Sequence, residues 1–478
     1  AVLSDLAGEL DRLTEAAKEP PIRPRPAGQA RVPLSQAQER LWFLWQLDPQ
    51  SAAYNMPGAL RLTGSLDVEA LRSALAGVVR RHESLRTRFE AEGGIACQVI
   101  EEAGGYYGWA EQDLSGQAEA ERERRLHEHL QEAAARPFDL ERGPLLRAGL
   151  IKLGEQEHVL QLVLHHIVSD GWSVGILLKE FVALYAAARE GRDAGLAALP
   201  IQYGDYALWQ REWLDEAALS EQLGYWRERL GTEHPVLELP VDRPRRGARS
   251  AAGGRVVRQV PTVLAGALRE LSQRRGATLF MTLLAAFDVL LYRYSGQKDL
   301  RVGVPVAGRH RLETEGLIGF FVNTLVLRSE LTGSTSFSQL LDQVRERILE
   351  AQAHQDVPFV RVVEAAQPQR SLSHTPLFQV MFSFEQGQTD VVGLPGLQVS
   401  WLASDSDAAQ FDLMLEATQE ADGLRLSFAY ACDVFDRATI ERLSAHYVEI
   451  LEQLSSGWDR RVGELALTVE HGERTLAA

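Results

Sequence analysis

The chain has 478 residues, of which 45% are hydrophobic and 24% are charged, a composition typical of a globular protein long enough for two hydrophobic cores. Its 66 acidic and 50 basic residues give a formal net charge of -16, which disfavours nucleic-acid binding and attachment to anionic membranes. Two cysteines, Cys97 and Cys432, are too few for a zinc cluster or a disulfide framework, and we see no signal segment and no membrane-spanning run. We therefore expect a cytoplasmic protein whose partners are proteins or small molecules.

The first half of the chain alternates between strands and long helices. Residues 1–18 carry leucines at helical spacing, and the proline-rich residues 20–26 predict a stiff linker. Hydrophobic periodicity predicts helices over 35–47, 68–80 and 118–135, and strands over 59–62 and 147–167. Strands mixed with long helices favour an α/β sandwich.

The second half repeats this kind of pattern without a residue-level repeat. Residues 186–199 are small, charged and irregular, so we place the boundary between two subdomains there. A new set of elements begins at Arg255 and includes helices over 264–274, 278–294 and 337–354, a strand over 300–306 and a glycine-rich excursion over 383–399. Two similar lobes that face each other would form a cleft, which is a preferred place for a ligand.

The most informative stretch is 159–173, an apolar strand that ends in two histidines, breaks at Asp170-Gly171 and continues as a helix. Side chains alternate along a strand, so His165 and His166 point to opposite faces and cannot easily chelate one metal. A single imidazole beside a turn carboxylate suits proton transfer or hydrogen bonding to a reacting amine. The alternative is a capped strand end, in which Asp170 binds turn amides and both rings fill space.

Residues 165–171 match His-His-x-x-x-Asp-Gly, the signature of the condensation domains of nonribosomal peptide synthetases and of related acyltransferases. Six further stretches resemble other motifs of this family, in the same order, within residues 33–465. They are Ser35–Leu44, Arg81–Phe89, Tyr203–Gln210, Ile318–Arg328, His354–Phe359 and Thr375–Phe382. Seven ordered matches make chance an unsatisfactory explanation, so the chain resembles a condensation domain.

The resemblance implies a fold like that of chloramphenicol acetyltransferase, with two mixed-sheet lobes in a V-shaped pseudo-dimer. We expect an N-terminal lobe over 33–191, which carries the histidine motif, and a C-terminal lobe over 192–466, with a latch that crosses to the first lobe. Residues 1–32 would be a linker from an upstream carrier domain, and residues 467–478 a linker to a downstream domain. As an excised piece the domain would be monomeric.

The reaction implied by the resemblance is amide formation between two thioesters held on carrier domains. His166 would orient the acceptor amine or take its proton, with His165 and Asp170 in support. Gly171 and its neighbouring amide would stabilise the oxyanion, because a turn that runs into a helix presents free N–H groups. No metal and no bound cofactor are expected: the phosphopantetheine arms of the upstream and downstream carrier domains act as substrate tethers, and an adjacent adenylation domain is implied.

Supporting roles are expected for residues outside the motif. Arg309, in the polar loop after strand 300–306, is the expected partner of Asp170, since a carboxylate in an interlobe cleft needs a cation or several amide donors to stay ionised. Arg86 is expected to be structural. Asn323, inside an apolar run, is either a hydrogen-bonding hub or a polar group of the channel.

Ser169 and Trp172 are expected to line the substrate tunnel. Three rival functions remain: an epimerase relative with the same motif, a recruitment module without catalysis, and a free-standing acyltransferase that uses coenzyme A. The 354–356 stretch and Asn323 resemble condensation domains better than epimerases, and the intact His166 speaks against a recruitment module. No phosphate-binding loop, nucleophile elbow or His-Glu-x-x-His helix is present.

Overall fold

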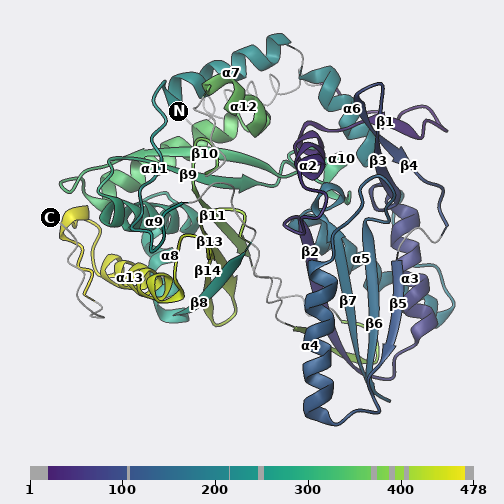
Figure 1. Ribbon diagram of the computed structural model, residues 1–478. Helices are drawn as coiled ribbons and strands as arrows, with labels where there is room; N and C mark the ends of the chain where they lie inside the picture. The colour runs from purple at the N-terminus through teal and green to yellow at the C-terminus, as the bar shows by residue number, and fades with distance from the viewer. Residues whose placement is uncertain are drawn as a thin grey trace.

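Two lobes, each built on a mixed β-sheet, stand side by side and are bridged at one end (Figure 1). The computed structural model describes residues 20–104, 108–214, 216–245, 252–367, 374–386, 393–402 and 409–468. The helix expected over residues 1–18 lies outside the described residues. Both sheets combine parallel and antiparallel pairs, which confirms the predicted α/β class with two mixed-sheet lobes.

The first lobe, drawn mostly in purple and blue in Figure 1, contains a five-stranded sheet in the order β12-β2-β7-β6-β5. These strands are β2 (Asn55–Gly64), β5 (Gly108–Asp113), β6 (Leu146–Gly154), β7 (Glu157–His165) and β12 (Leu397–Leu402). A small sheet beside it has the order β1-β4-β3 and consists of β1 (Arg31–Pro33), β3 (Thr87–Glu92) and β4 (Ile95–Ile100). Strand β7 is largely apolar because helices cover both faces of its sheet.

Helices of the first lobe lie on both sides of that sheet. They are α2 (Gln36–Leu47), α3 (Val68–Arg81), α4 (Glu119–Ala135) and α5 (Gly171–Glu190), with short 3-10 turns η1 (Glu83–Arg86) and η2 (His166–Val168). Helices α3 and α5 pack on one face and α4 on the other. Helix α5 ends at Glu190 and is capped by Gly191, which adopts a left-handed φ of 64°. The first residues of the stretch 186–199 are therefore helical and not irregular as expected.

The second lobe contains a six-stranded sheet in the order β10-β9-β11-β13-β14-β8. These strands are β8 (Gly253–Pro261), β9 (Asp299–Val306), β10 (Asn323–Glu330), β11 (Val380–Gln386), β13 (Leu413–Glu420) and β14 (Gly423–Ala431). One face is covered by α8 (Thr262–Arg274), α9 (Leu279–Ser295), α11 (Phe337–Ala353) and α13 (Arg437–Ser455). Most residues of α9 are buried, as expected for the central helix of the largest core.

Segments from both halves of the chain join the lobes. The remaining helical elements are α6 (Tyr203–Trp213), α7 (Glu216–Leu230), α10 (Leu312–Glu315), α12 (Phe359–Ala366) and η3 (Val462–Glu464). Helices α6 and α7 form the bridge between the lobes in Figure 1. Strand β12 comes from the second half of the chain, yet it pairs antiparallel with β2 and so becomes an edge of the first-lobe sheet.

By length and composition alone, α5 would be sufficient to cross a membrane, which was not expected from the sequence. The bent pair α8 and α9 also passes this test if it is taken as one span. Such helices are weak evidence, because core helices of soluble domains pass the same test. In this structure Leu177, Phe181 and Tyr185 of α5 are buried in the first-lobe core.

Asp288 on α9 is a buried carboxyl group that is hydrogen-bonded to Ser329, and it predicts a pH dependence of stability. Ser329 Oγ donates to Asp288 Oδ2 at 2.6 Å, while burial raises the pKa of Asp288 to about 7. A carboxyl with a raised pKa in the folded state stabilises the fold at low pH, and this contribution is lost as the pH rises toward about 7. At about 1.4 kcal/mol per pKa unit, the loss is at most about 4 kcal/mol.

We expect Asp288→Asn to flatten this part of the stability profile, because the amide stays neutral at every pH. The measurement is urea unfolding of both proteins between pH 4.5 and 8. The wild-type protein should lose stability relative to the variant as the pH rises. Parallel profiles for the two proteins would show that Asp288 titrates as an ordinary exposed carboxyl.

Candidate active site between the two lobes

The histidine motif forms the predicted strand, turn and helix. Strand β7 ends at His165, the turn η2 covers His166 to Val168, and Asp170 caps the N-terminus of α5 by accepting the N–H of Ser173 at 2.8 Å. Because β7 ends at His165 and not at residue 167 as predicted, the alternation of faces along the strand does not apply to His166. His166 is positioned by the turn.

His166 is fixed by its own loop. Its Nδ1 lies 2.8 Å from the carbonyl oxygen of Ser169, so Nδ1 carries a proton and Nε2 is left as an acceptor in the neutral ring. The ring is partly exposed and meets Phe320 of the second lobe edge-on, with 4.8 Å between centroids. Burial lowers the pKa of His166, opposed by the charge of Asp170, which favours the neutral, proton-accepting form.

His165 has a different environment. It is 4% exposed, its Nδ1 accepts the N–H of Ile167 at 3.1 Å, and its ring lies against Phe138 and Tyr54. Burial lowers the pKa of His165 to about 3, with smaller contributions from His166 and Arg147. A buried ring with so low a pKa is neutral near pH 7, and its contacts hold the end of β7 in place.

Asp170 and Arg309 form the expected ion pair, which is buried. Arg309 Nη2 lies 3.0 Å from Asp170 Oδ1 and 3.3 Å from Oδ2, and the two side chains are 1% and 0% exposed. The guanidinium also donates to the carbonyl oxygens of Thr314 and Leu317, each at 2.7 Å, and lies over the ring of Phe321. Excellent geometry and additional hydrogen bonds are what a buried ion pair requires.

A short segment of the second lobe, residues 317–321, is bound to the first lobe by polar contacts around this pair. Phe321 N–H donates to Asp170 Oδ2 at 3.0 Å, and Ser173 Oγ accepts the N–H of Gly319 at 3.0 Å. At Ile318 the carbonyl oxygen accepts from Ser84 Oγ at 2.7 Å. Ser84 and Ser173 were not predicted from the sequence, although Ser173 stands three residues after the capping Asp170, where a helix cap is expected to bind.

A large cavity of 1260 Å³ lies between the lobes at the start of α5. Gly171 and Trp172 line it, and the N–H groups of these two residues have no acceptor among the described residues. Gly171 has no left-handed φ, and a Cβ atom built on it would meet only Glu385 Oε1, at 3.9 Å. Trp172 is 53% exposed, so it lies in the wall of the cavity, with its indole N–H bound to the carbonyl oxygen of Glu315 at 3.1 Å.

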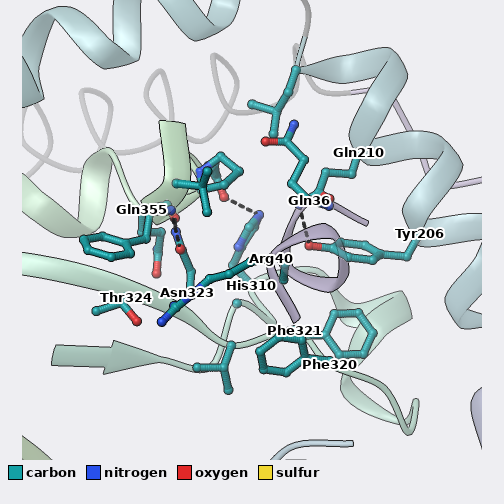
Figure 2. Close-up of a pocket in the computed structure, with 18 of the residues that line it drawn as sticks. Gln36, Arg40, Tyr206, Gln210, His310, Phe320, Phe321, Asn323, Thr324 and Gln355 are labelled. Carbon is teal, nitrogen blue, oxygen red and sulfur yellow. Dashed lines mark hydrogen bonds and ion pairs between the residues drawn. The ribbon is translucent and has the colours of Figure 1, made fainter. Parts of the chain in front are cut away.

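A smaller cavity of 60 Å³ lies on the other side of Phe320. Figure 2 shows Asn323, Thr324 and Gln355 of the second lobe facing Tyr206 and Gln210 of α6 across it. Val322 belongs to the walls of both cavities, so the segment that contacts His166 separates them. His166 itself is in neither lining, but it touches the partition between the two cavities.

Asn323 forms a hydrogen-bonding hub and also lies at a cavity wall, so it has features of both expectations for it. Its Nδ2 donates to the carbonyl oxygens of Gln355 and Val357, each at 2.7 Å, and its Oδ1 accepts the N–H of Phe359 at 3.0 Å. These bonds hold the loop between α11 and α12 against the start of β10. Asn323 also contributes to the wall of the smaller cavity.

Ser169 and Arg86 do not face the large cavity. Ser169 is 0% exposed, its Oγ has no hydrogen-bond partner among the described residues and it is not part of the cavity wall, so the expectation that Ser169 lines the tunnel is wrong. The turn η2 folds the backbone inward and carries the serine with it. Arg86 donates to the carbonyl oxygen of Glu101 and lies 3.5 Å from Glu83, and both contacts are within the first lobe, as a structural role requires.

Among the described residues no group of three or more histidine, cysteine or acidic side chains could hold a metal ion. The groups available for chemistry at this site are His166, the free N–H groups at the head of α5 and the walls of the cavity beside them.

The family model of the condensation domain matches residues 28–477, so the chain belongs to the condensation domain family. Peptide bond formation is the general function of this family, and its members occur in nonribosomal peptide synthetases. The chain is 48% identical to part of a linear gramicidin synthase from Brevibacillus parabrevis over 95% of its own length, and it spans 6% of that protein.

Among the solved structures that are similar over nearly the whole chain are an X-domain and a condensation domain. The X-domain of teicoplanin biosynthesis, solved in complex with OxyB, is 30% identical, with a TM-score of 0.84 and coverage of 95% of this chain and 99% of that chain. The first condensation domain of the calcium-dependent antibiotic synthetase is 23% identical, with a TM-score of 0.77 and coverage of 92% and 100%. At 23% identity, the similarity to this condensation domain shows the shared fold alone.

The ion pair predicts strong energetic coupling across the lobes. We expect Asp170→Asn to destabilise the protein by roughly 3 to 5 kcal/mol, because it leaves a desolvated guanidinium without its counter-charge. Arg309→Ala should cost a similar amount. The double variant with Asp170→Asn and Arg309→Met should recover part of the loss, because no buried charge remains alone.

Urea unfolding of the wild-type protein, Asp170→Asn, the single variant Arg309→Met and the double variant gives the coupling free energy, expected to be about 1 to 3 kcal/mol for residues in contact. Recovery will be incomplete because the carbonyl oxygens of Thr314 and Leu317 lose a donor. Simple additivity of the two single changes would contradict the contact.

Proposed function

We propose that this domain joins the upstream acyl or peptidyl thioester to the α-amine of the downstream aminoacyl thioester, each held on the phosphopantetheine arm of a carrier domain. The proposal is carried by His166, whose Nδ1–H is fixed by the carbonyl oxygen of Ser169, while its Nε2 has no hydrogen bond to any described residue and could meet an amine. It needs no ATP, since a thioester is already activated.

In the proposed reaction the amine nitrogen attacks the thioester carbonyl carbon and a C–N bond forms. The tetrahedral oxyanion is stabilised by the N–H groups of Gly171 and Trp172 at the positive end of α5, which have no acceptor among the described residues. The amine proton passes toward Nε2 of His166, or His166 only orients the amine. The C–S bond then breaks and the thiolate leaves on the upstream arm, where it takes up a proton.

The same proposal places a carrier arm on each side of the motif. The large cavity and the smaller cavity flank the segment that touches His166, which supports approach from two directions. The proposal also includes a division into lobes over 33–191 and 192–466, with linkers over 1–32 and 467–478 and with β12 as the latch. An adjacent adenylation domain, a cytoplasmic location and a monomeric state belong to the same proposal.

A recruitment module is the second candidate function, favoured by the likeness to the X-domain that was solved with OxyB. An epimerase would use the same imidazole to move a proton at an α-carbon. Mass spectrometry after incubation with loaded carrier domains separates the three functions. A new amide supports condensation, an inverted α-carbon supports epimerisation, and carrier binding without any covalent change supports recruitment.

We expect His166→Ala to leave the fold intact and to lower amide formation by about two to four orders of magnitude, the usual contribution of a general base or an orienting group. If His166 is a base, wild-type activity should fall on the acid side below the lowered pKa of its imidazole. An orienting role would leave only a weak dependence on pH. Wild-type turnover by the variant would exclude both roles.

A bulky side chain at position 171 should block the large cavity without unfolding the protein. Gly171→Trp introduces no left-handed strain, and its side chain has open space in the cavity. We expect an unchanged melting temperature and lost amide formation. Gly171→Ala is the matched control and should keep most activity, so an active tryptophan variant would contradict access through this cavity.

A further inference from the structure

One acidic side chain in the wall of the large cavity has no role in the proposed chemistry. Glu385 lies on β11, and it lines the cavity between the lobes. Its Oε1 is 3.9 Å from where a Cβ atom of Gly171 would stand, so the carboxylate lies opposite the head of α5. The carboxylate is therefore close to the reacting centre.

The neighbouring charges on the same sheet are already paired. Glu385 is in register with Thr418 on β13, which is in register with Arg425 on β14. Arg425 Nε donates to Glu420 at 2.8 Å, and these two residues also line the cavity. Glu385 has no hydrogen bond or ion pair with any described residue, so the charged residues of the lining sum to one uncompensated negative charge.

The surroundings of Glu385 favour a cation. Burial raises the pKa of Glu385 and the charge of Glu416 on β13 adds to the effect, while the charge of Arg425 opposes it, so the ionised form is compensated only in part. A bound cation would complete that compensation. Trp172 and Trp401 also line the cavity and are 53% and 50% exposed, and indole faces attract ammonium and guanidinium groups.

We propose that the large cavity selects a substrate whose side chain carries an ammonium or guanidinium group, and that Glu385 binds this group. The inference rests on the proposed function, because it assumes that the substrate is an amino acid held as a thioester. Glu385 is then a specificity-determining residue, and the aromatic walls accommodate the methylene chain that leads to the charge.

The test compares lysyl with norleucyl thioesters, whose side chains are both linear and differ in the terminal ammonium. Each compound is tested in two separate assays, once loaded on the upstream carrier domain and once on the downstream carrier domain. In each assay kcat/KM for amide formation is measured. In one of these positions the wild-type protein should prefer lysine by about tenfold to hundredfold, the usual effect of one hydrogen bond to a charged group. Glu385→Gln should abolish the preference and leave the norleucine rate unchanged.

Two further variants sharpen the result. Glu385→Lys should shift the preference from lysyl toward glutamyl thioesters. Thr418→Val changes the adjacent position of the same wall without changing its charge, so it should keep the wild-type ratio of lysine to norleucine. Thermal melting of each variant confirms that it is folded.

Two outcomes would overturn the inference. One is the absence of a lysine preference at both positions. The other is an equal loss of the lysine and norleucine rates in Glu385→Gln, which would place the carboxylate on the α-amine common to both substrates.

A binding measurement separates this inference from the proposed function. Quenching of tryptophan fluorescence by lysyl-pantetheine amide and by norleucyl-pantetheine amide needs no turnover. Selective binding of the lysyl compound that is lost in Glu385→Gln, in a protein that forms no amide, would reject the proposed function and keep the inference. Amide formation without lysine selectivity would keep the proposed function and reject the inference.

Discussion

The buried ion pair of Asp170 and Arg309 is the interaction on which the rest of the site depends. One carboxylate caps α5, pairs with the guanidinium of the second lobe and accepts the N–H of Phe321. Two desolvated charges are tolerable only while all these contacts persist together. The position of the histidine loop and the arrangement of the lobes are therefore coupled, and neither can shift without disturbing the other.

Local features of the site could be predicted from the sequence, because they follow from short-range rules. The apolar run before Asp170-Gly171 predicts a strand, a turn and a capped helix, and the cost of an unpaired carboxylate predicts a cation such as Arg309. Contacts between residues far apart in the sequence, such as that of Ser173 with Gly319, depend on how the lobes pack and leave no local pattern. The expectation for Ser169 was wrong for a similar reason, since a polar turn residue is ordinarily exposed.

The electrostatic character of the site follows from burial as much as from residue type. His165 and His166 are neighbours in sequence, yet burial lowers the pKa of the first to about 3, while the second lies at the interlobe partition with no hydrogen bond from its Nε2 to a described residue. Glu385 faces the large cavity opposite the N-terminus of α5, where the charge of Arg425 compensates its carboxylate only in part. The N–H donors of α5 and the carboxylate of Glu385 thus lie on the large cavity, and His166 lies at the partition beside it.

The pairing of β12 with β2 also limits how the domain can move. Six consecutive residue pairs, from Leu397 with Gly64 to Leu402 with Ala59, join β12, a strand from the second half of the chain, to the sheet of the first lobe. Residues 317–321 fasten the lobes at another place. The lobes can move apart at both places only if hydrogen bonds of this kind are broken. For the proposed function this would mean that a carrier arm has to enter the cavity lengthwise, so the length of the tether would matter as much as its chemistry.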